Sequence, residues 1–130
     1  MKKQFLIVVG IWLTAALSLA QIPHVITIDD VNFHNGKITN YHSPYTKIII
    51  PSYLNGQVVT SIGDDAFNNK SLSSAVLPTS IVSIGKNAFK SNELTNIEIS
   101  SSTTLIDDYA FSSNALTSVM IPVSWRVSFL

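Results

Sequence analysis

"SIGKNAFKSNELTNIEIS", residues 83–100, recurs in nearly the same form 22 residues earlier and 22 residues later. Four columns of the aligned copies are identical: Ile62, Ile84 and Ile106; Ala66, Ala88 and Ala110; Phe67, Phe89 and Phe111; Leu72, Leu94 and Leu116. Further columns keep their apolar character, such as Ala75, Ile97 and Val119. A fixed period of this length predicts a solenoid in which each copy forms one coil.

Each copy contains one short segment of the form L-x-x-Φ-x-Φ, where Φ is apolar: "LSSAVL", "LTNIEI" and "LTSVMI". This alternation predicts a strand with every second side chain facing the interior. A lone strand cannot pair within its own coil, so stacked coils should form a parallel sheet on one face. The remainder of each copy, as in "SIGKNAF", predicts mostly irregular or short helical segments behind that sheet, with Ile84 and Phe89 in the core.

Particular residues should shape the turns of each coil. Gly63 and Gly85 suit a tight turn at positive φ, and Asp107, which replaces glycine in the third copy, tolerates that conformation. Asn92 and a matching Asn114 should point inward and bond the exposed amides of the loop. The first copy has Lys70 at this position, so we expect that coil to be looser or its lysine to be in solvent.

Residues 61–99, "SIGDDAFNNKSLSSAVLPTSIVSIGKNAFKSNELTNIEI", resemble the BspA-like, or Treponema-type, leucine-rich repeat family. Its signature is I-G-x-x-A-F followed by x-x-N-x-L-T-x-V-x-I-P, and the match covers roughly residues 48–122. Lys70 for Asn, Asp107 for Gly and Ser100 for Pro depart from it. The resemblance implies a leucine-rich repeat solenoid, secreted or exposed at the cell surface, that binds proteins of a host, a matrix or a neighbouring cell. It brings no catalytic residues.

The N-terminus has the form of a secretory signal peptide over residues 1–20. Lys2 and Lys3 precede an apolar run, and Ser18-Leu19-Ala20 forms a small-x-small cleavage site. An uncleaved anchor is the alternative, but the 16 residues from Phe5 to Ala20 fall short of the roughly 20 that a spanning helix needs. We therefore expect secretion or cell-surface exposure after cleavage near Ala20, with only transient membrane contact.

Residues 21–47 are predicted to form an N-terminal cap, because apolar residues alternate on both sides of Asn35-Gly36, a strong hairpin signal. The array itself should span residues 48–122, as an irregular first coil with a turn inserted near Asn55-Gly56 and then about three 22-residue units. The tail at 123–130, "VSWRVSFL", abandons the pattern. It could be a last strand, or the end of a truncated array; we favour truncation, because bare apolar side chains at an open edge invite aggregation.

The sequence contains few residues in patterns typical of metal binding, nucleic-acid binding or catalysis. The chain has no cysteine, 12% charged residues and no net charge, which does not fit a thiolate metal site or a nucleic-acid binder. His24, His34 and His42 lack a metal-ligand spacing and are predicted to be surface or cap residues. The Asp doublets at 29–30, 64–65 and 107–108 lack a calcium-loop pattern and are predicted to be solvated turns. We expect no enzyme, no cofactor and no small-molecule substrate.

A binding surface should come from strand side chains that point outward. The periodicity gives two rows: Ser74, Asn96 and Ser118, then Val76, Glu98 and Met120. A protein partner is the expected ligand; the alternatives are a merely solvated face and a structural remnant without a ligand. Four short strands offer a face of only about 250 Å², against about 800 Å² per partner in a standard interface. Binding by this chain alone should therefore be weak.

Overall fold

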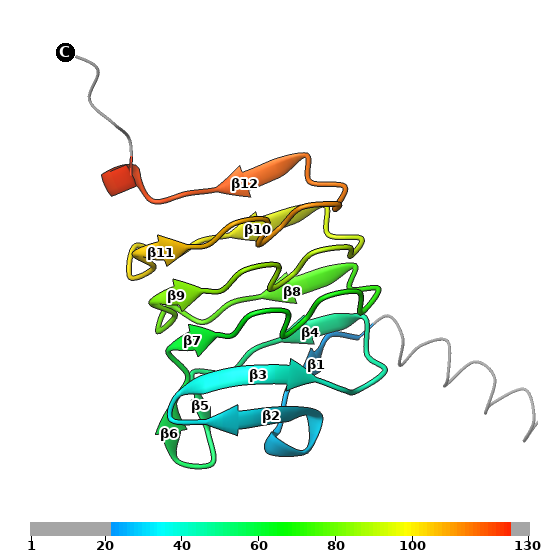
Figure 1. Ribbon diagram of the computed structural model, residues 1–130, viewed down its shortest axis with the longest axis vertical. Helices are drawn as coiled ribbons and strands as arrows, with labels where there is room; N and C mark the ends of the chain where they lie inside the picture. The colour runs from blue at the N-terminus through cyan, green and yellow to red at the C-terminus, as the bar shows by residue number, and fades with distance from the viewer. Residues whose placement is uncertain (1–21, 126–130) are drawn as a thin grey trace, which may run out of the picture.

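The computed structural model describes residues 22–125. The predicted signal peptide at 1–20 and most of the predicted tail lie outside these residues. The chain winds into stacked coils, and two parallel sheets run along the stack (Figure 1). One sheet, which we call the front sheet whatever the view, contains β1 (His24–Val25), β4 (Lys47–Ile49), β8 (Ser74–Val76), β10 (Asn96–Glu98) and β12 (Ser118–Met120). The back sheet contains β2 (Val31–His34), β3 (Lys37–Tyr41), β7 (Ser61–Ile62), β9 (Ser83–Ile84) and β11 (Leu105–Ile106). The leucine-rich repeat solenoid is thus confirmed.

The front sheet follows the predicted pattern, because each coil places one short strand beside the next. Its hydrogen-bonded order is β1-β4-β8 and then β10-β12, with β8 and β10 adjacent in the stack. The register matches the 22-residue period, since Asn96 lies opposite Ser118 and Glu98 opposite Met120. The outward rows predicted from the sequence are therefore aligned in space.

The back of the coils is more regular than expected. The segments behind the front sheet are mostly irregular, as predicted, but each coil also contains a two-residue strand there, and Ser83 lies opposite both Ser61 and Leu105. The reason is the repeat itself, which places equivalent backbone groups at equal height, so that the Gly85 amide donates to the Ile62 carbonyl over 2.9 Å. The only helices within residues 22–125 are the 3-10 turns η1 (Ile28–Asp30) and η2 (Val123–Trp125).

The predicted hairpin caps the N-terminal end of the stack. β2 and β3 pair antiparallel around Asn35 and Gly36, and both turn residues have positive φ. β3 then pairs parallel with β7, which joins the hairpin to the back sheet. The turn inserted in the first coil is a second hairpin, β5 (Tyr53–Leu54) and β6 (Gln57–Val58), and it closes at Asn55-Gly56.

The identical columns form the core, as predicted. Ile62, Ile84, Phe67, Phe89, Leu72 and Leu94 are all at most 1% exposed. The rings of Tyr41, Phe67, Phe89 and Phe111 stack in sequence, with centroids 5.2, 4.9 and 5.5 Å apart. Tyr41 of the cap hairpin thus ends a ladder that the phenylalanine column builds.

The expectation for the glycine column was wrong. Gly63, Gly85 and Asp107 do not have positive φ; the left-handed residues are Asp65, Asn87 and Tyr109, and Asn69, Ser91 and Ser113, again 22 apart. Glycine is required at position 85 for space, because a Cβ there would lie 2.7 Å from the backbone nitrogen of Asp64. Close stacking of neighbouring coils, rather than turn conformation, explains this residue.

The inward asparagines hold the loops together, and they do so across coils. Asn92 is buried; its side-chain oxygen accepts from the amides of Lys70 and Leu72, both at 3.0 Å, and its Nδ2 donates to the carbonyls of Phe67 and Phe89, both at 2.8 Å. Asn114 makes the equivalent bonds one coil later: it accepts from the amide of Leu94 and donates to the carbonyls of Phe89 and Phe111. Each asparagine therefore provides hydrogen-bond partners for backbone groups of the coil before its own. Lys70 is itself half-buried, and the Asn92 bonds hold its loop.

Residues 123–125 do not form the strand that was one alternative for the tail. They form η2, and Trp125 packs partly buried against the core. The remaining residues of the predicted alternation, Val127 and Phe129, lie outside the described chain.

Candidate functional site

The six residues predicted for partner binding lie together on the outer face of the front sheet. Ser74 is half-buried, while Asn96 and Ser118 beside it are exposed. In the second row, the side chains of Val76 and Met120 are 51% and 61% exposed. Glu98 is exposed between them, because it shares β10 with the buried Ile97 and points the other way. The structure thus places all six on one surface, and whether they bind a partner stays a prediction.

The second row is longer than the sequence analysis indicated. Ile49 lies opposite Val76, and Val25 lies opposite Ile49, so both extend the row toward the N-terminus. Val25 is 52% exposed and Ile49 is half-buried. The sequence could have indicated Ile49, because in the "KIII" run, residues 47–50, it lies between Ile48 and Ile50, which are both buried. Val25 gave no comparable signal, since its strand lies outside the 22-residue pattern.

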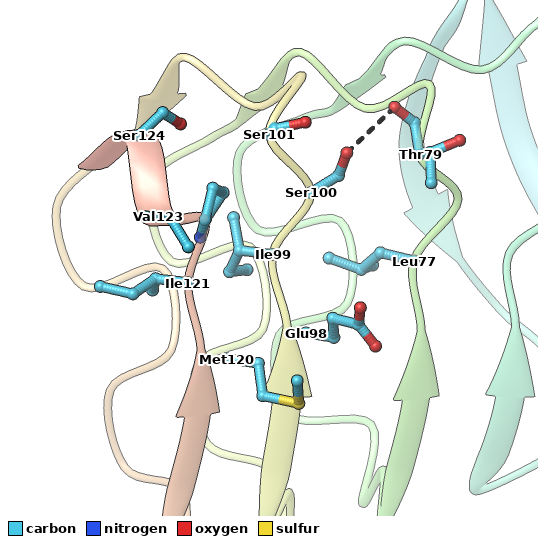
Figure 2. A pocket seen from close by; sticks show the side chains of 11 residues that line it. Leu77, Thr79, Glu98, Ile99, Ser100, Ser101, Met120, Ile121, Val123 and Ser124 are labelled. Carbon is cyan, nitrogen blue, oxygen red and sulfur yellow. Dashed lines mark hydrogen bonds between the residues drawn. The ribbon is translucent and has the colours of Figure 1, made fainter. Parts of the chain in front are cut away.

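A groove opens where strands β8, β10 and β12 end (Figure 2). Its volume is about 600 Å³. Three aliphatic side chains of one column, Leu77, Ile99 and Ile121, line it, and Glu98 and Met120 of the second row border it. The groove was not predicted, because the aliphatic column was assigned wholly to the core, whereas Ile121 is 52% exposed.

The rim of the groove opposite Glu98 carries hydroxyl groups. Thr79, Ser100, Ser101 and Ser124 lie there, and the Ser100 hydroxyl donates to the Thr79 carbonyl over 3.3 Å (Figure 2). Ser100 stands where the repeat signature has proline, so the departure from the signature supplies a polar group at this position. The groove therefore combines an aliphatic floor with a polar rim.

Glu98 is the only charged side chain that lines the groove. Among the described residues it has no hydrogen bond and no ion pair, so its carboxylate is available to a ligand. No histidine, lysine or cysteine lines the groove with it. This arrangement suits recognition of a complementary surface, and it lacks the paired acid and base that general acid–base catalysis uses.

The first Asp doublet has a role in the cap that the sequence analysis did not foresee. Asp29 is an exposed turn residue as predicted, but Asp30 is only 6% exposed. Its carboxylate accepts from the amide of Thr27 at 2.7 Å, contacts His24 Nε2 at 2.9 Å and accepts a short hydrogen bond from Ser43. The prediction of a solvated residue was wrong because the 3-10 turn η1 folds its side chain under the cap.

The cap cluster contains a serine, an aspartate and a histidine, yet its geometry is not that of a nucleophilic triad. Ser43 and His24 both bond to Asp30, whereas a triad needs the histidine between the other two. The His24 ring also stacks on Tyr45 with centroids 3.7 Å apart. The cluster holds β1 and the residues after β3 together, so its role is structural.

Two pKa shifts arise in this region. Burial alone would raise the pKa of Asp30, but hydrogen bonds from Ser43, Thr27 and His24 together outweigh it and hold the pKa well below its usual range. Burial, together with the negative charge of Asp30, raises the pKa of Tyr41 to about 12. Both groups lie in the cap, away from the groove, and both keep their usual charge state at neutral pH.

The other candidate residues lie apart from one another. The doublets at 64–65 and 107–108 are exposed, as predicted, and His34 and His42 are exposed cap residues. Within residues 22–125, no three histidine, aspartate or glutamate side chains are grouped so that they could hold a metal ion. Over the same range no helix has the length and apolar character needed to cross a membrane.

A capped stack of coils with two parallel sheets and an exposed front face defines a solenoid repeat protein. The model of the BspA-type leucine-rich repeat region matches residues 26–127 in six copies, and the chain belongs to this family. Comparisons with curated proteins and with solved structures gave no match. The family match begins 22 residues before Ile48, the start of the predicted array, so it includes the cap hairpin. Leucine-rich repeat domains generally mediate protein–protein interaction, and such repeats are typically non-enzymatic.

Proposed function

We propose that this chain is a secreted or cell-surface binding module that adheres to a protein of a host, a matrix or a neighbouring cell. The front face and its groove are the binding surface. The observation that carries this proposal is the row formed by Val76, Glu98 and Met120, in which two large apolar side chains are exposed around an unpaired carboxylate. The signal-peptide form of residues 1–20 supports the location.

The chemistry of the row indicates what kind of surface it fits. Val76 and Met120 provide apolar contact area, and methionine adapts its shape to different partners. Glu98 favours a partner with a lysine or arginine at the matching place. The groove beside them can take an aliphatic side chain against Leu77, Ile99 and Ile121. A protein surface offers these groups together.

The test is capture of surface proteins by the purified chain and by the double variant Glu98→Lys, Met120→Ser. We expect saturable binding to at least one matrix or cell-surface protein, and at least a tenfold loss of affinity in the variant, which corresponds to about 1.4 kcal/mol. Both substitutions lie on exposed side chains, so the circular dichroism spectrum and melting temperature should be unchanged.

A matched control is Glu93→Lys, Tyr53→Ser. Glu93 precedes β10 and Tyr53 belongs to the β5–β6 hairpin; both side chains are exposed and neither lines the groove. This variant makes the same charge change and also removes apolar surface, so it should bind like the original chain. Equal loss of binding in both variants would place the binding surface elsewhere. No saturable binding to any protein tested would favour a structural piece without its own ligand.

A further inference from the structure

The chain contains two Asn-Gly pairs, and each forms the turn of a hairpin. Asn35-Gly36 joins β2 to β3, and Asn55-Gly56 joins β5 to β6. The backbone is nearly the same at both turns: φ is 49° and 76° at Asn35 and Gly36, and 47° and 74° at Asn55 and Gly56. Both asparagines are exposed. The two turns thus have the same residues in the same conformation, and they differ in what surrounds them.

Gly36 is held in place by the chain around it. The residue is buried, and its carbonyl accepts hydrogen bonds from the amides of Thr60 and Ser61, at 2.8 and 3.0 Å. A Cβ at this position would lie 2.7 Å from the Thr60 hydroxyl oxygen and 3.0 Å from the Val58 carbonyl oxygen. The turn at Asn35-Gly36 therefore cannot change its backbone conformation without breaking these contacts.

Gly56 has no such surroundings. It is exposed, and apart from its two chain neighbours no atom lies within 4 Å of the place that a Cβ would occupy. Within residues 22–125, no residue outside the hairpin hydrogen-bonds to Asn55 or Gly56. In the same part of the chain β5 and β6 pair with each other and with no further strand. The turn at Asn55-Gly56 is therefore free to change its conformation.

This freedom matters because an Asn-Gly pair can react internally. The backbone nitrogen of the glycine attacks the side-chain Cγ of the asparagine, a C–N bond forms, and the side-chain amide leaves as ammonia. Water then opens the five-membered imide at either carbonyl, which gives aspartate or isoaspartate. Glycine permits the attack because it has no Cβ to shield its nitrogen. Ring closure joins this nitrogen to the asparagine side chain, so the peptide plane between the two residues must first rotate out of the turn.

We infer that Asn55 is a site of spontaneous covalent modification, where the folded protein forms aspartate and isoaspartate, and that Asn35 is protected from the same reaction. The rotation that Asn35 needs disturbs a glycine held by Thr60 and Ser61, whereas Asn55 has room to rotate. Local opening of a segment with so few contacts costs little free energy. The inference is independent of whether the front face binds a partner.

The product differs from asparagine in charge and in shape. Each event places one negative charge at the tip of the β5–β6 hairpin, and isoaspartate also inserts an extra methylene into the backbone of a two-residue turn. The tip lies at the N-terminal end of the stack, away from β10 and β12 (Figure 1). Because β5 and β6 belong neither to the front sheet nor to the back sheet, the stack should keep its fold after modification.

The test is incubation of the purified folded chain at mildly alkaline pH, followed by trypsin digestion and mass spectrometry. Cleavage after Lys37 and Lys47 puts Asn35 and Asn55 on different peptides. Replacement of the amide by a hydroxyl raises the peptide mass by about one dalton; fragmentation locates the site, and retention time separates the isoaspartyl form. Because opening at Gly36 must break two backbone hydrogen bonds, modification should be at least about tenfold faster at Asn55 than at Asn35.

The matched control is the same chain unfolded in urea. Both asparagines keep their following glycine there but lose their different surroundings, so the two rates should become similar. A second control is Gly56→Ala, whose methyl group enters open space and shields the attacking nitrogen. This variant should slow the reaction at Asn55 and leave the rate at Asn35 unchanged.

Equal rates at the two sites of the folded chain would overturn the inference. It would also be overturned if Asn55 stayed intact in the folded chain and reacted in urea, because the turn itself would then be protective. If Gly56→Ala does not fold, the comparison of the folded chain with the chain in urea still decides the matter, since it needs no substitution.

Discussion

Replacing Asn92 with alanine should destabilise the protein more than any single change on its surface. The side chain is 7% exposed and makes five hydrogen bonds to the backbone. Four of them are 2.8–3.0 Å long and reach Lys70, Leu72, Phe67 and Phe89. Asn92→Ala leaves these groups without partners in a space too small to be freely hydrated.

The magnitude follows from the count of bonds. At about 1 kcal/mol for each well-formed bond, Asn92→Ala should cost about 3–5 kcal/mol. Asn114→Ala is the internal comparison, because Asn114 makes similar bonds but is only half-buried, in the last coil that the structure describes. Water can replace its lost partners, so the cost should be about 1–2 kcal/mol. Urea unfolding followed by circular dichroism measures both values.

Asn92→Asp separates the donor half of the amide from the acceptor half. The carboxylate keeps an acceptor for the amides of Lys70 and Leu72 but faces the carbonyl of Phe89. Burial and this carbonyl should raise the pKa of the new group above its unfolded value of about 3.9. The variant should therefore lose stability relative to the original chain as the pH rises from about 4 to about 7.

The reasoning fails if Asn92→Ala unfolds within about 0.5 kcal/mol of the original chain. It fails equally if Asn114→Ala costs as much, since burial at the middle coil is what distinguishes the two. A pH-independent difference for Asn92→Asp would show that the donor bonds contribute little.

Five further substitutions test other parts of the fold. Phe89→Ala removes a buried ring stacked on two neighbours and should cost about 3–5 kcal/mol in urea unfolding; Phe111→Ala, at the half-buried end of the ladder, should cost clearly less. Gly85→Ala should cost about 1–3 kcal/mol, because the new methyl group meets the backbone of the preceding coil; a melting temperature equal to the original would contradict that close approach. The raised pKa of Tyr41, about 12, contributes stability that is full below pH 10 and lost as the pH climbs to 12, so Tyr41→Phe should flatten the alkaline part of a pH–stability curve. The lowered pKa of Asp30 contributes stability that is present above its unfolded pKa of about 3.9 and lost as the pH falls below it; Asp30→Asn should make acid unfolding less steep.

The period of the sequence was sufficient to predict the stack, its front sheet and its core. Identical letters 22 apart, such as Phe67 and Phe89, occupy equivalent places because each coil repeats the path of the last. The hairpin at Asn35-Gly36 was predictable for a local reason, since those two residues favour positive φ. What depends on spacing along the chain was therefore accessible from the sequence.

Features that depend on contact between coils were not accessible. The need for glycine at position 85 comes from the backbone of Asp64, one coil away, and sequence patterns alone suggested a turn instead. The burial of Asp30 depends on Ser43, which arrives from the far side of the hairpin. The groove near Glu98 lies beside β12, the last strand within the described residues, whereas the repeat pattern describes only a coil with neighbours on both sides.

The asparagine column gives the stack a mechanical direction. Because Asn114 holds the loop of the coil before it, and Asn92 the one before that, detaching a coil from the C-terminal end releases the bonds on which its predecessor depends. A force applied to the C-terminus should therefore peel the molecule as a series of similar steps, each lengthening the extended chain by about 75 Å for 22 residues. Unwinding from the other end must first open the cap hairpin. Because the tension in a stretched chain is the same at both ends, the coils should thus open first at the C-terminal side of the described stack, and the cap hairpin should open last.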